Sequence, residues 1–337
     1  MPKPCRPGAG LTLLFFILVA LFPFTAARAA GIRDFVIPAD NRGPKILAEL
    51  WTPCAGPAAE IVVDSETWPV AIRGLRDCTI AHKPLPLIVI SHGLFGDRFS
   101  HHDTAEFLAD AGFAVVSVNH TQDSVLSYND KSASDISPFL TRPVDIKRVI
   151  DALLSQPPAG LDIDSNRIGF FGFSRGGYTG LVLAGAVPDF HHPAFPCTEK
   201  IPLCQEMSGT DIAPHPAGYE PRIKAFVLAD PLSFFADKST LNGVKAPIQL
   251  WRSAQGGMGV TPESVEAIAQ NLPARPEFHR VPNSTHMSFI FPCTAAFAKT
   301  NPPPVCTDPP GFDRTQFHAQ FNAAVLGFFR TQLGEGQ

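Results

Sequence analysis

A serine framed by two glycines constrains this chain more than any other short stretch. Ser174 lies two residues from Gly172 and two from Gly176, within GFFGFSRGGYTG, and an apolar run precedes it. A G-x-S-x-G sequence between a strand and a helix is typical of a sharp turn that presents a nucleophilic serine. The glycines allow the backbone to bend and pack closely there. In the alternative reading, the turn is merely glycine-rich and Ser174 only caps the following helix.

The surrounding sequence alternates between strand and helix patterns. Apolar runs predict strands at 85–90, 113–118, 167–173, 223–230, 247–253 and 278–282. Helix patterns occur at 104–112, 141–156, 175–186, 261–272 and 313–333. Residues 33–38 and 45–53 predict an antiparallel opening pair. Strands that are apolar throughout are typical of a sheet covered on both faces. We therefore expect an α/β-hydrolase fold, with a mostly parallel sheet, an antiparallel N-terminal pair and helices on both faces.

This regularity lapses over residues 188–220, which are rich in proline, cysteine and histidine. We interpret the segment as an insertion after the helix that leaves Ser174, lying over the site and held by Cys197 and Cys204. The sequence shows no internal repeat, and residues 30–337 are predicted to form a single domain.

Residues 1–29 have the pattern of a secretory signal peptide. Two basic residues precede an apolar run at 11–24, and Ala27 and Ala29 have the spacing of a cleavage site. A membrane anchor is the alternative, but the run is short for a span and contains Pro23. The prediction is an exported protein, periplasmic or extracellular, with no membrane span after signal removal. The net charge of −4 and the lack of a basic run argue against a nucleic-acid partner.

The cysteine content agrees with export. The chain has seven cysteines, and Cys5 lies in the predicted signal peptide. The even number that remains favours disulfides in an exported chain, whereas no C-x-x-C spacing supports a zinc site. The spacing suggests three local pairs, Cys54–Cys78, Cys197–Cys204 and Cys293–Cys306.

A nucleophilic serine needs a histidine base, which in this fold class comes late in the chain. His286 lies just after the last predicted strand. His279 lies within that strand and His318 lies on the terminal helix, so both fit less well. His286 is therefore the predicted base.

The acid should lie between the serine and the histidine. Asp230 ends the strand at 223–230, at the sheet edge where sites form. Glu263 competes, but its place in the first turn of a helix is already explained by the helix dipole. We predict Asp230 as the acid, with Glu263 as the alternative.

An acyl-transfer site also needs N–H donors for the developing oxyanion. The residue after the nucleophile, Arg175, supplies one. The loop SHGLFGDR supplies the other, from Leu94 or less favourably from Phe95, while His92 is expected to orient this loop.

Several apolar residues near these positions could line a substrate pocket, although ordinary core packing explains them equally well. They are Phe95, Phe173, Phe234, Phe235 and Met287. The adjacent histidines at 101–102 and 191–192 are expected to be solvated loop residues rather than metal ligands.

Together, these motifs resemble secreted bacterial relatives of platelet-activating-factor acetylhydrolase, which are grouped with dienelactone-hydrolase-like proteins. The resemblance is carried by PLIVISHGLFGDRFS, RPVDIKRVIDALL, DSNRIGFFGFSRGGYTGLVLAGA, FVLADP and STHMSFIFPC, together with the opening strand pair. It implies that Asp230 is the acid and that Leu94 is the second oxyanion donor. True dienelactone hydrolases carry a cysteine nucleophile, so Ser174 argues against that reaction.

The sequence thus predicts a serine carboxylic ester hydrolase acting on short-acyl or lipid-like esters, without a cofactor or metal. A polyester or other acyl hydrolase is one alternative. A non-catalytic binding protein on the same fold is another, because a fold does not fix a function.

Overall fold

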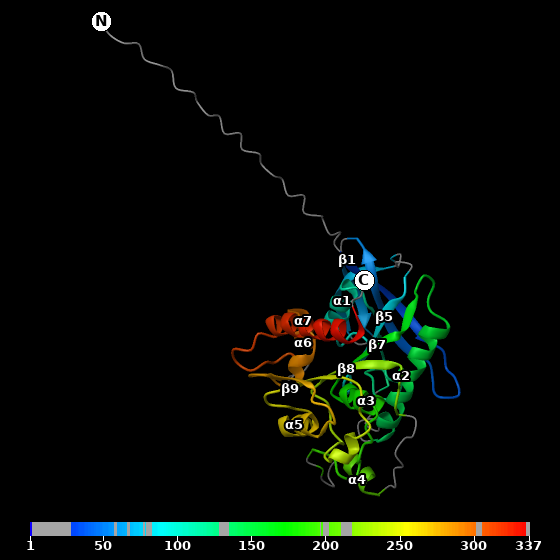
Figure 1. Cartoon of the computed structure of the whole chain (residues 1–337), viewed down its shortest axis with the longest axis vertical. Helices are drawn as coiled ribbons and strands as arrows, with labels where there is room; N and C mark the ends of the chain where they lie inside the picture. The colour runs from blue at the N-terminus through cyan, green and yellow to red at the C-terminus, as the bar shows by residue number, and fades with distance from the viewer. Residues whose placement is uncertain are drawn as a thin grey trace.

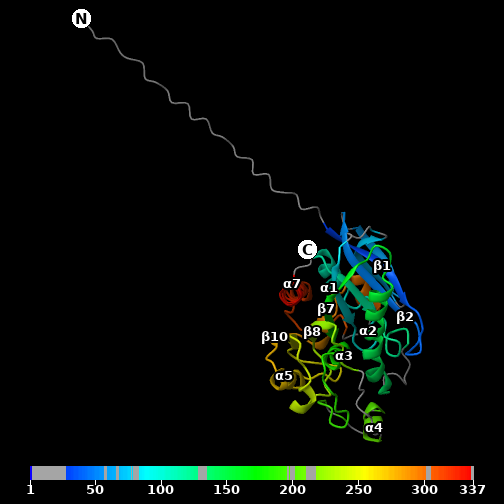
Figure 2. The same ribbon diagram turned by 45° about the vertical axis from the view of Figure 1, so that its right-hand side comes forward.

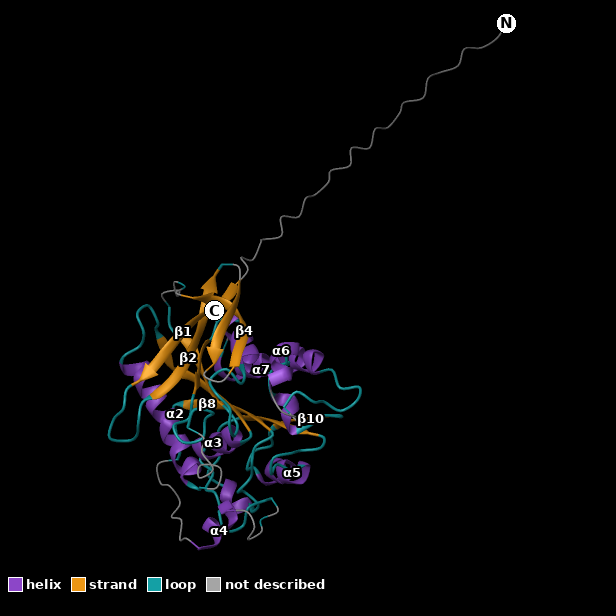
Figure 3. Ribbon diagram, turned by 180° about the vertical axis from the view of Figure 1, so that it is seen from behind, coloured by secondary structure: helices purple, strands orange, loops and turns teal. Residues whose placement is uncertain are grey.

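The computed structural model describes residues 1, 28–56, 59–65, 68–76, 78, 83–127, 135–195, 197, 202–209, 218–300 and 305–334. The strands of these residues form one ten-stranded sheet in the order β10-β9-β8-β7-β5-β6-β2-β1-β4-β3. Figure 3 shows this twisted sheet, with β1, β2 and β4 together at one end of it.

The central strands are parallel, as the sequence predicts. They are β5 (Leu85–Ser91), β6 (Ala114–Val118), β7 (Ile163–Phe173), β8 (Ile223–Ala229), β9 (Ile248–Ser253) and β10 (Glu277–Val281). Every residue of β5 and β6 is buried. Strands of this kind must be covered on both faces, which accounts for their unbroken apolar sequences.

The N-terminal strands are antiparallel and lie beyond β6. β1 (Arg28–Ile37) pairs with β2 (Ile46–Ala55), which in turn pairs with β6. A second hairpin, β3 (Ala59–Ser65) and β4 (Trp68–Arg76), extends the sheet beside β1. The sequence pattern did not indicate this hairpin. Only one of its faces is covered, since Val63 is buried whereas Val62 is 61% exposed, so it lacks a continuous apolar run.

The helices cover both faces of the sheet (Figures 1 and 2). One face carries α2 (Ser137–Ser155), α3 (Arg175–Leu183) and α5 (Pro262–Asn271). The other carries α1 (His102–Asp110) and α7 (Arg314–Leu333). The short elements are α4 (Pro202–Gly209), α6 (Ala295–Thr300), and the 3-10 helices η1 (Lys238–Leu241) and η2 (His286–Phe289). Among the described segments, no helix is long and apolar enough to cross a membrane.

The predicted insertion at 188–220 is described in part. Its helix α4 lies at the end of the molecule opposite β1 (Figures 1 and 2). Leu203 and Met207 of α4 are buried in the core cluster shared with α2 and α3. A carboxylate oxygen of Glu206 accepts a hydrogen bond from the Ile136 N–H at 2.8 Å, where α2 begins. Helix α4 of the insertion is therefore bonded to the residue that precedes α2.

Disulfides join the three local cysteine pairs that the spacing suggested: Cys54–Cys78, Cys197–Cys204 and Cys293–Cys306. Residues 2–27, which contain most of the predicted signal peptide and Cys5, lie outside the described residues, and β1 begins at Arg28.

Candidate active site

Ser174 occupies a strained turn between β7 and α3. Its backbone has φ 56° and ψ −115°, a conformation that costs free energy in a residue with a side chain. The turn folds so tightly that a Cβ on Gly172 would lie 2.2 Å from the Gly176 carbonyl oxygen. A Cβ on Gly176 would lie 1.9 Å from the carbonyl oxygen of Ser91. Glycine at both positions is therefore a steric requirement of the turn around Ser174.

Asp230 lies beside this turn because β7 and β8 are neighbouring parallel strands. Phe173 pairs with Ala229, so Ser174 and Asp230 each follow directly after their strand. The Asp230 carboxylate is 1% exposed and is fixed by Ser253 at the end of β9. One of its oxygens accepts the Ser253 N–H at 2.8 Å, and the other accepts the Ser253 hydroxyl at 2.6 Å.

His286 begins η2 and joins the same edge of the sheet. Its Nδ1 lies 2.9 Å from a carboxylate oxygen of Asp230, and the side chain is 2% exposed. Its backbone N–H donates to the Gly256 carbonyl, and its ring packs on Phe173 with centroids 4.5 Å apart. The structure thus pairs His286 with Asp230, the residue that follows β8 beside the Ser174 turn. Glu263, the alternative acid, is exposed in the first turn of α5.

The loop after β5 lies against the serine. A Cβ on Gly93 would lie 3.2 Å from the Ser174 Cβ. The Phe95 N–H donates to the Asp123 carbonyl at 3.3 Å, and the Gly96 N–H donates to the Gly93 carbonyl at 3.3 Å. The N–H groups of the two residues after Leu94 are therefore engaged within the protein.

Beneath this loop lies a buried network of charged residues that the sequence analysis did not identify. Arg142 of α2 is 0% exposed and donates to the Asp123 carboxylate at 2.9 Å. The Arg175 side chain donates to the same carboxylate at 3.1 Å. One signal could have revealed Arg142, because it lies four residues before Ile146 on the helix face that also presents Val149 to the core. An arginine on that face must have a buried partner.

His92 orients the loop, in agreement with its expected role. It is fully buried, and its Nε2 accepts the His120 N–H at 3.2 Å. Its Nδ1 therefore carries the proton and donates to the Gly93 carbonyl at 2.6 Å. Burial, reinforced by the charge of Arg142, lowers the pKa of His92 well below its ordinary value. The imidazole is thus neutral and serves as a support.

The predicted pocket residues divide into two groups. Phe234 and Phe235 are 0% exposed and pack against the Tyr178 ring, so both belong to the core. Phe173 is buried beneath the His286 ring, whereas Phe95 and Met287 are partly exposed. The partly exposed side chains are the ones that a ligand at this edge could contact.

The expectation that all four paired histidines are solvated is half wrong. His191 and His192 are exposed, but His101 and His102 are buried where the chain enters α1. The His101 ring packs edge-on against Phe171 and Phe173, at 5.0 and 5.4 Å between centroids. Within the described part of the chain, no three His, Cys, Asp or Glu side chains form a group that could hold a metal ion.

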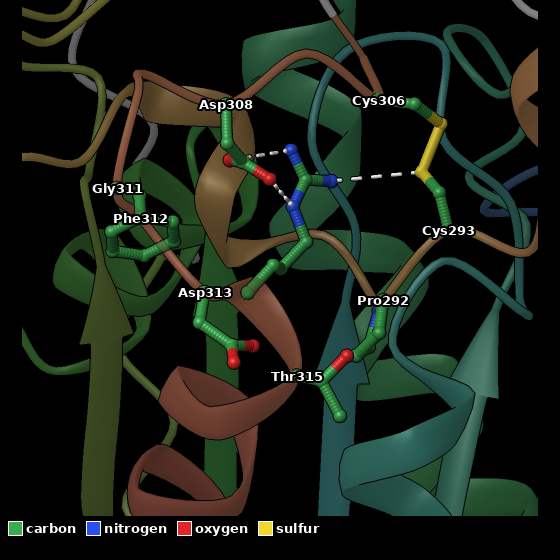
Figure 4. Close-up of a pocket in the computed structure, with 9 residues that line it drawn as sticks. Pro292, Cys293, Cys306, Asp308, Gly311, Phe312, Asp313 and Thr315 are labelled. Atoms are coloured by element: carbon green, nitrogen blue, oxygen red, sulfur yellow. Dashed lines mark hydrogen bonds and ion pairs between the residues drawn. A yellow bond between two sulfur atoms is a disulfide. The ribbon is translucent and has the colours of Figure 1, made fainter.

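A cavity of about 480 Å³ lies beside the Cys293–Cys306 disulfide (Figure 4). Its buried cation, Arg314, donates to both carboxylate oxygens of Asp308 at 2.9 Å, and Asp308 also accepts from the Ser288 hydroxyl. None of Ser174, Asp230 or His286 lines this cavity. Because Ser288 belongs to η2, the ion pair supports the segment that begins with His286.

The parallel central strands, the strained serine after β7, and the carboxylate and histidine after later strands define an α/β-hydrolase fold. The solved structure of a ferulic acid esterase from Streptomyces cinnamoneus has a similar fold, with a TM-score of 0.64 and 19% sequence identity. The similarity covers 94% of this chain and 92% of that chain. A scan of protein-family models and a search of curated proteins found no match.

Proposed function

We propose that this protein is a serine carboxylic ester hydrolase with Ser174 as nucleophile, His286 as base and Asp230 as acid. One observation carries the proposal: Ser174 lies in a strained turn at the sheet edge where a buried His286–Asp230 pair is also held. Strain of this kind clusters at functional sites.

In the proposed reaction, the Ser174 hydroxyl attacks the ester carbonyl while His286 takes its proton. The Leu94 and Arg175 N–H groups stabilise the oxyanion, and Asp230 stabilises the imidazolium. Collapse of the intermediate breaks the bond to the alcohol, which leaves with the proton from His286. Water then attacks the acyl-enzyme, with His286 again as base, and releases the carboxylic acid.

The proposed substrates are short-acyl or lipid-like esters. Support comes from the sequence resemblance to acetylhydrolase relatives and from the partly exposed Phe95 and Met287 near the loops that bear Leu94 and His286. The named activity of the structural neighbour, a ferulic acid esterase, also belongs to the ester-hydrolase class.

We also propose that the protein is exported and acts in the periplasm or outside the cell. The three disulfides support this location, because disulfides persist in oxidising compartments. N-terminal sequencing of the exported protein should begin at Ala30.

An organophosphonate probe tests the activity directly. It should label the protein once, with the adduct on Ser174 in peptide mass spectra, and a panel of p-nitrophenyl esters and a phospholipid should then rank the substrates. A folded protein that is neither labelled nor active on any of these esters would contradict the proposal and favour a non-catalytic binding protein.

A further inference from the structure

We propose that Arg142 is a positioning residue that aims the Leu94 N–H at the oxyanion and couples it to the second donor through Asp123. This inference rests on the proposed function, because it assigns a role within the same site. Three sets of hydrogen bonds around Arg142 and Asp123 carry it.

The first set fixes the peptide group that bears the Leu94 N–H. Arg142 donates one guanidinium nitrogen to the Gly93 carbonyl at 3.1 Å and another to the His92 carbonyl at 2.7 Å. In a trans peptide the C=O and the N–H point in opposite directions. His92 Nδ1 donates to the same Gly93 carbonyl at 2.6 Å, so the two side chains hold it together. Holding this carbonyl toward Arg142 turns the Leu94 N–H away from Arg142. Because Gly93 also packs against the Ser174 Cβ, this peptide lies next to the proposed nucleophile.

The second set links this loop to the nucleophile turn. The Asp123 carboxylate accepts from Arg142 Nε at 2.9 Å and from the Arg175 side chain at 3.1 Å. Burial acts to raise the pKa of Asp123, but the charges of Arg142 and Arg175 outweigh it and hold the pKa below its ordinary value. The carboxylate therefore stays ionised between the two guanidinium groups. One buried ion cluster thus joins Arg175 to the peptide group between Gly93 and Leu94.

The third set removes a competing donor. The backbone carbonyl of Asp123 accepts the Phe95 N–H at 3.3 Å. Phe95 has φ 59°, so the loop holds a strained conformation just after Leu94. The same short segment that pairs with Arg142 thus engages the Phe95 N–H and leaves Leu94 as the donor.

The comparison of Arg142 with Arg148 separates a positioning role from a structural one. Arg148 lies on the same helix, is also 0% exposed, and contacts the Asp40 carboxylate and the Pro38 carbonyl, with a longer ion pair of 3.8 Å to Asp145 one turn earlier on α2. Pro38 and Asp40 lie in the turn after β1, far along the sequence from the Ser174 turn. Arg148 is therefore a matched control in burial, charge and location on α2.

The test uses Arg142→Lys, which keeps a cation beside Asp123 but lacks the planar fork that holds two carbonyls. Removal of one oxyanion donor typically costs about 100- to 1000-fold in kcat. We expect Arg142→Lys to lower kcat by about 30-fold or more with KM changed less than about threefold. We also expect it to weaken binding of a trifluoromethyl ketone, which forms a tetrahedral adduct, by the same factor as kcat/KM. In Arg148→Lys, kcat and the affinity for the trifluoromethyl ketone should both stay within about threefold of wild type.

The outcomes separate the two proposals. If kcat of Arg142→Lys stays within threefold of wild type, the proposed function stands and the positioning role is overturned. Equal losses in the Arg142→Lys and Arg148→Lys variants, or a loss confined to KM, would also overturn it, because either pattern indicates a structural effect. Should Arg142→Lys not fold, Asp123→Asn gives the same test, since it keeps the shape but removes the charge that joins the two arginines. A wild-type protein without esterase activity or phosphonate labelling would instead overturn the proposed function.

Discussion

At the scale of single residues, Asp230 shows how the site is held. Its carboxylate contacts His286 and receives two hydrogen bonds from Ser253, so its geometry is fixed by the neighbouring strand. Asp230 itself has φ 45°, a conformation that is uncommon for a residue other than glycine. Its position could be inferred from the sequence because it ends an apolar strand. The Ser253 contacts could not, because they depend on how β8 and β9 meet.

The acid assignment can be tested by a pair of substitutions. Asp230→Asn keeps the shape but removes the charge that orients and stabilises the imidazolium, so we expect kcat to fall by about a thousandfold or more. Glu263→Gln should change kcat by less than about threefold, because Glu263 is exposed at a helix start. Steady-state kinetics of both variants measure this, and the reverse ranking would transfer the role to Glu263.

His101 makes the fold sensitive to acid. Burial lowers the pKa of His101 to about 3, from 6.5 when it is solvated. Between these values the unfolded chain binds a proton that the folded chain does not, so the free energy of unfolding falls as the pH decreases through this range. From pH 7 to pH 5 the loss due to His101 is about 2 kcal/mol.

Between pH 7 and pH 5, the free energy of unfolding of His101→Phe should therefore fall by about 2 kcal/mol less than that of wild type. Urea unfolding at the two pH values measures the difference. His191→Phe, at an exposed position, should behave as wild type does. If the free energy of unfolding of His101→Phe falls as much as that of wild type, His101 is not the source of the acid sensitivity.

At the scale of elements, the sequence predicted the buried strands and the first antiparallel pair, but not the hairpin of β3 and β4. The runs that became β5 and β6 are apolar because helices cover both faces. The strand order placed the segments that bear Ser174, Asp230 and His286 after β7, β8 and β10. The Arg142–Asp123–Arg175 cluster was missed for a different reason. Its members come from α2, from the loop after β6 and from α3, and only the packed fold brings their charges together.

The Cys293–Cys306 disulfide constrains the segment that follows η2. It closes a loop of sequence separation 13, for which loop-closure entropy gives about 3 kcal/mol of stabilisation. Replacing both cysteines with serine should lower the free energy of unfolding by about that amount, as measured by urea titration.

The Cys197–Cys204 pair is the control. Its sequence separation is 7, for which loop-closure entropy gives a smaller stabilisation of about 2 kcal/mol. Its double serine variant should keep kcat within about threefold of wild type. A Cys293/Cys306 variant as stable as wild type would contradict the stabilisation expected from loop closure.

At the scale of the whole molecule, one sheet positions every part of the proposed chemistry. The nucleophile turn, the acid and the base follow β7, β8 and β10, and the oxyanion loop follows β5, so the four segments meet at the carboxyl edge of parallel strands. The helical layer that contains α2 and α3 buries the Arg142–Asp123–Arg175 cluster beneath that edge. The proposed chemistry therefore depends on the hydroxyl oxygen of Ser174 as the nucleophile.

Hydrolysis of p-nitrophenyl esters by Ser174→Ala tests that claim most directly. The substitution removes one oxygen from a residue that is 5% exposed, so the variant should fold and melt within a few degrees of wild type. We predict that its kcat/KM falls by at least about a thousandfold. A folded Ser174→Ala protein that keeps activity within tenfold of wild type would contradict the account.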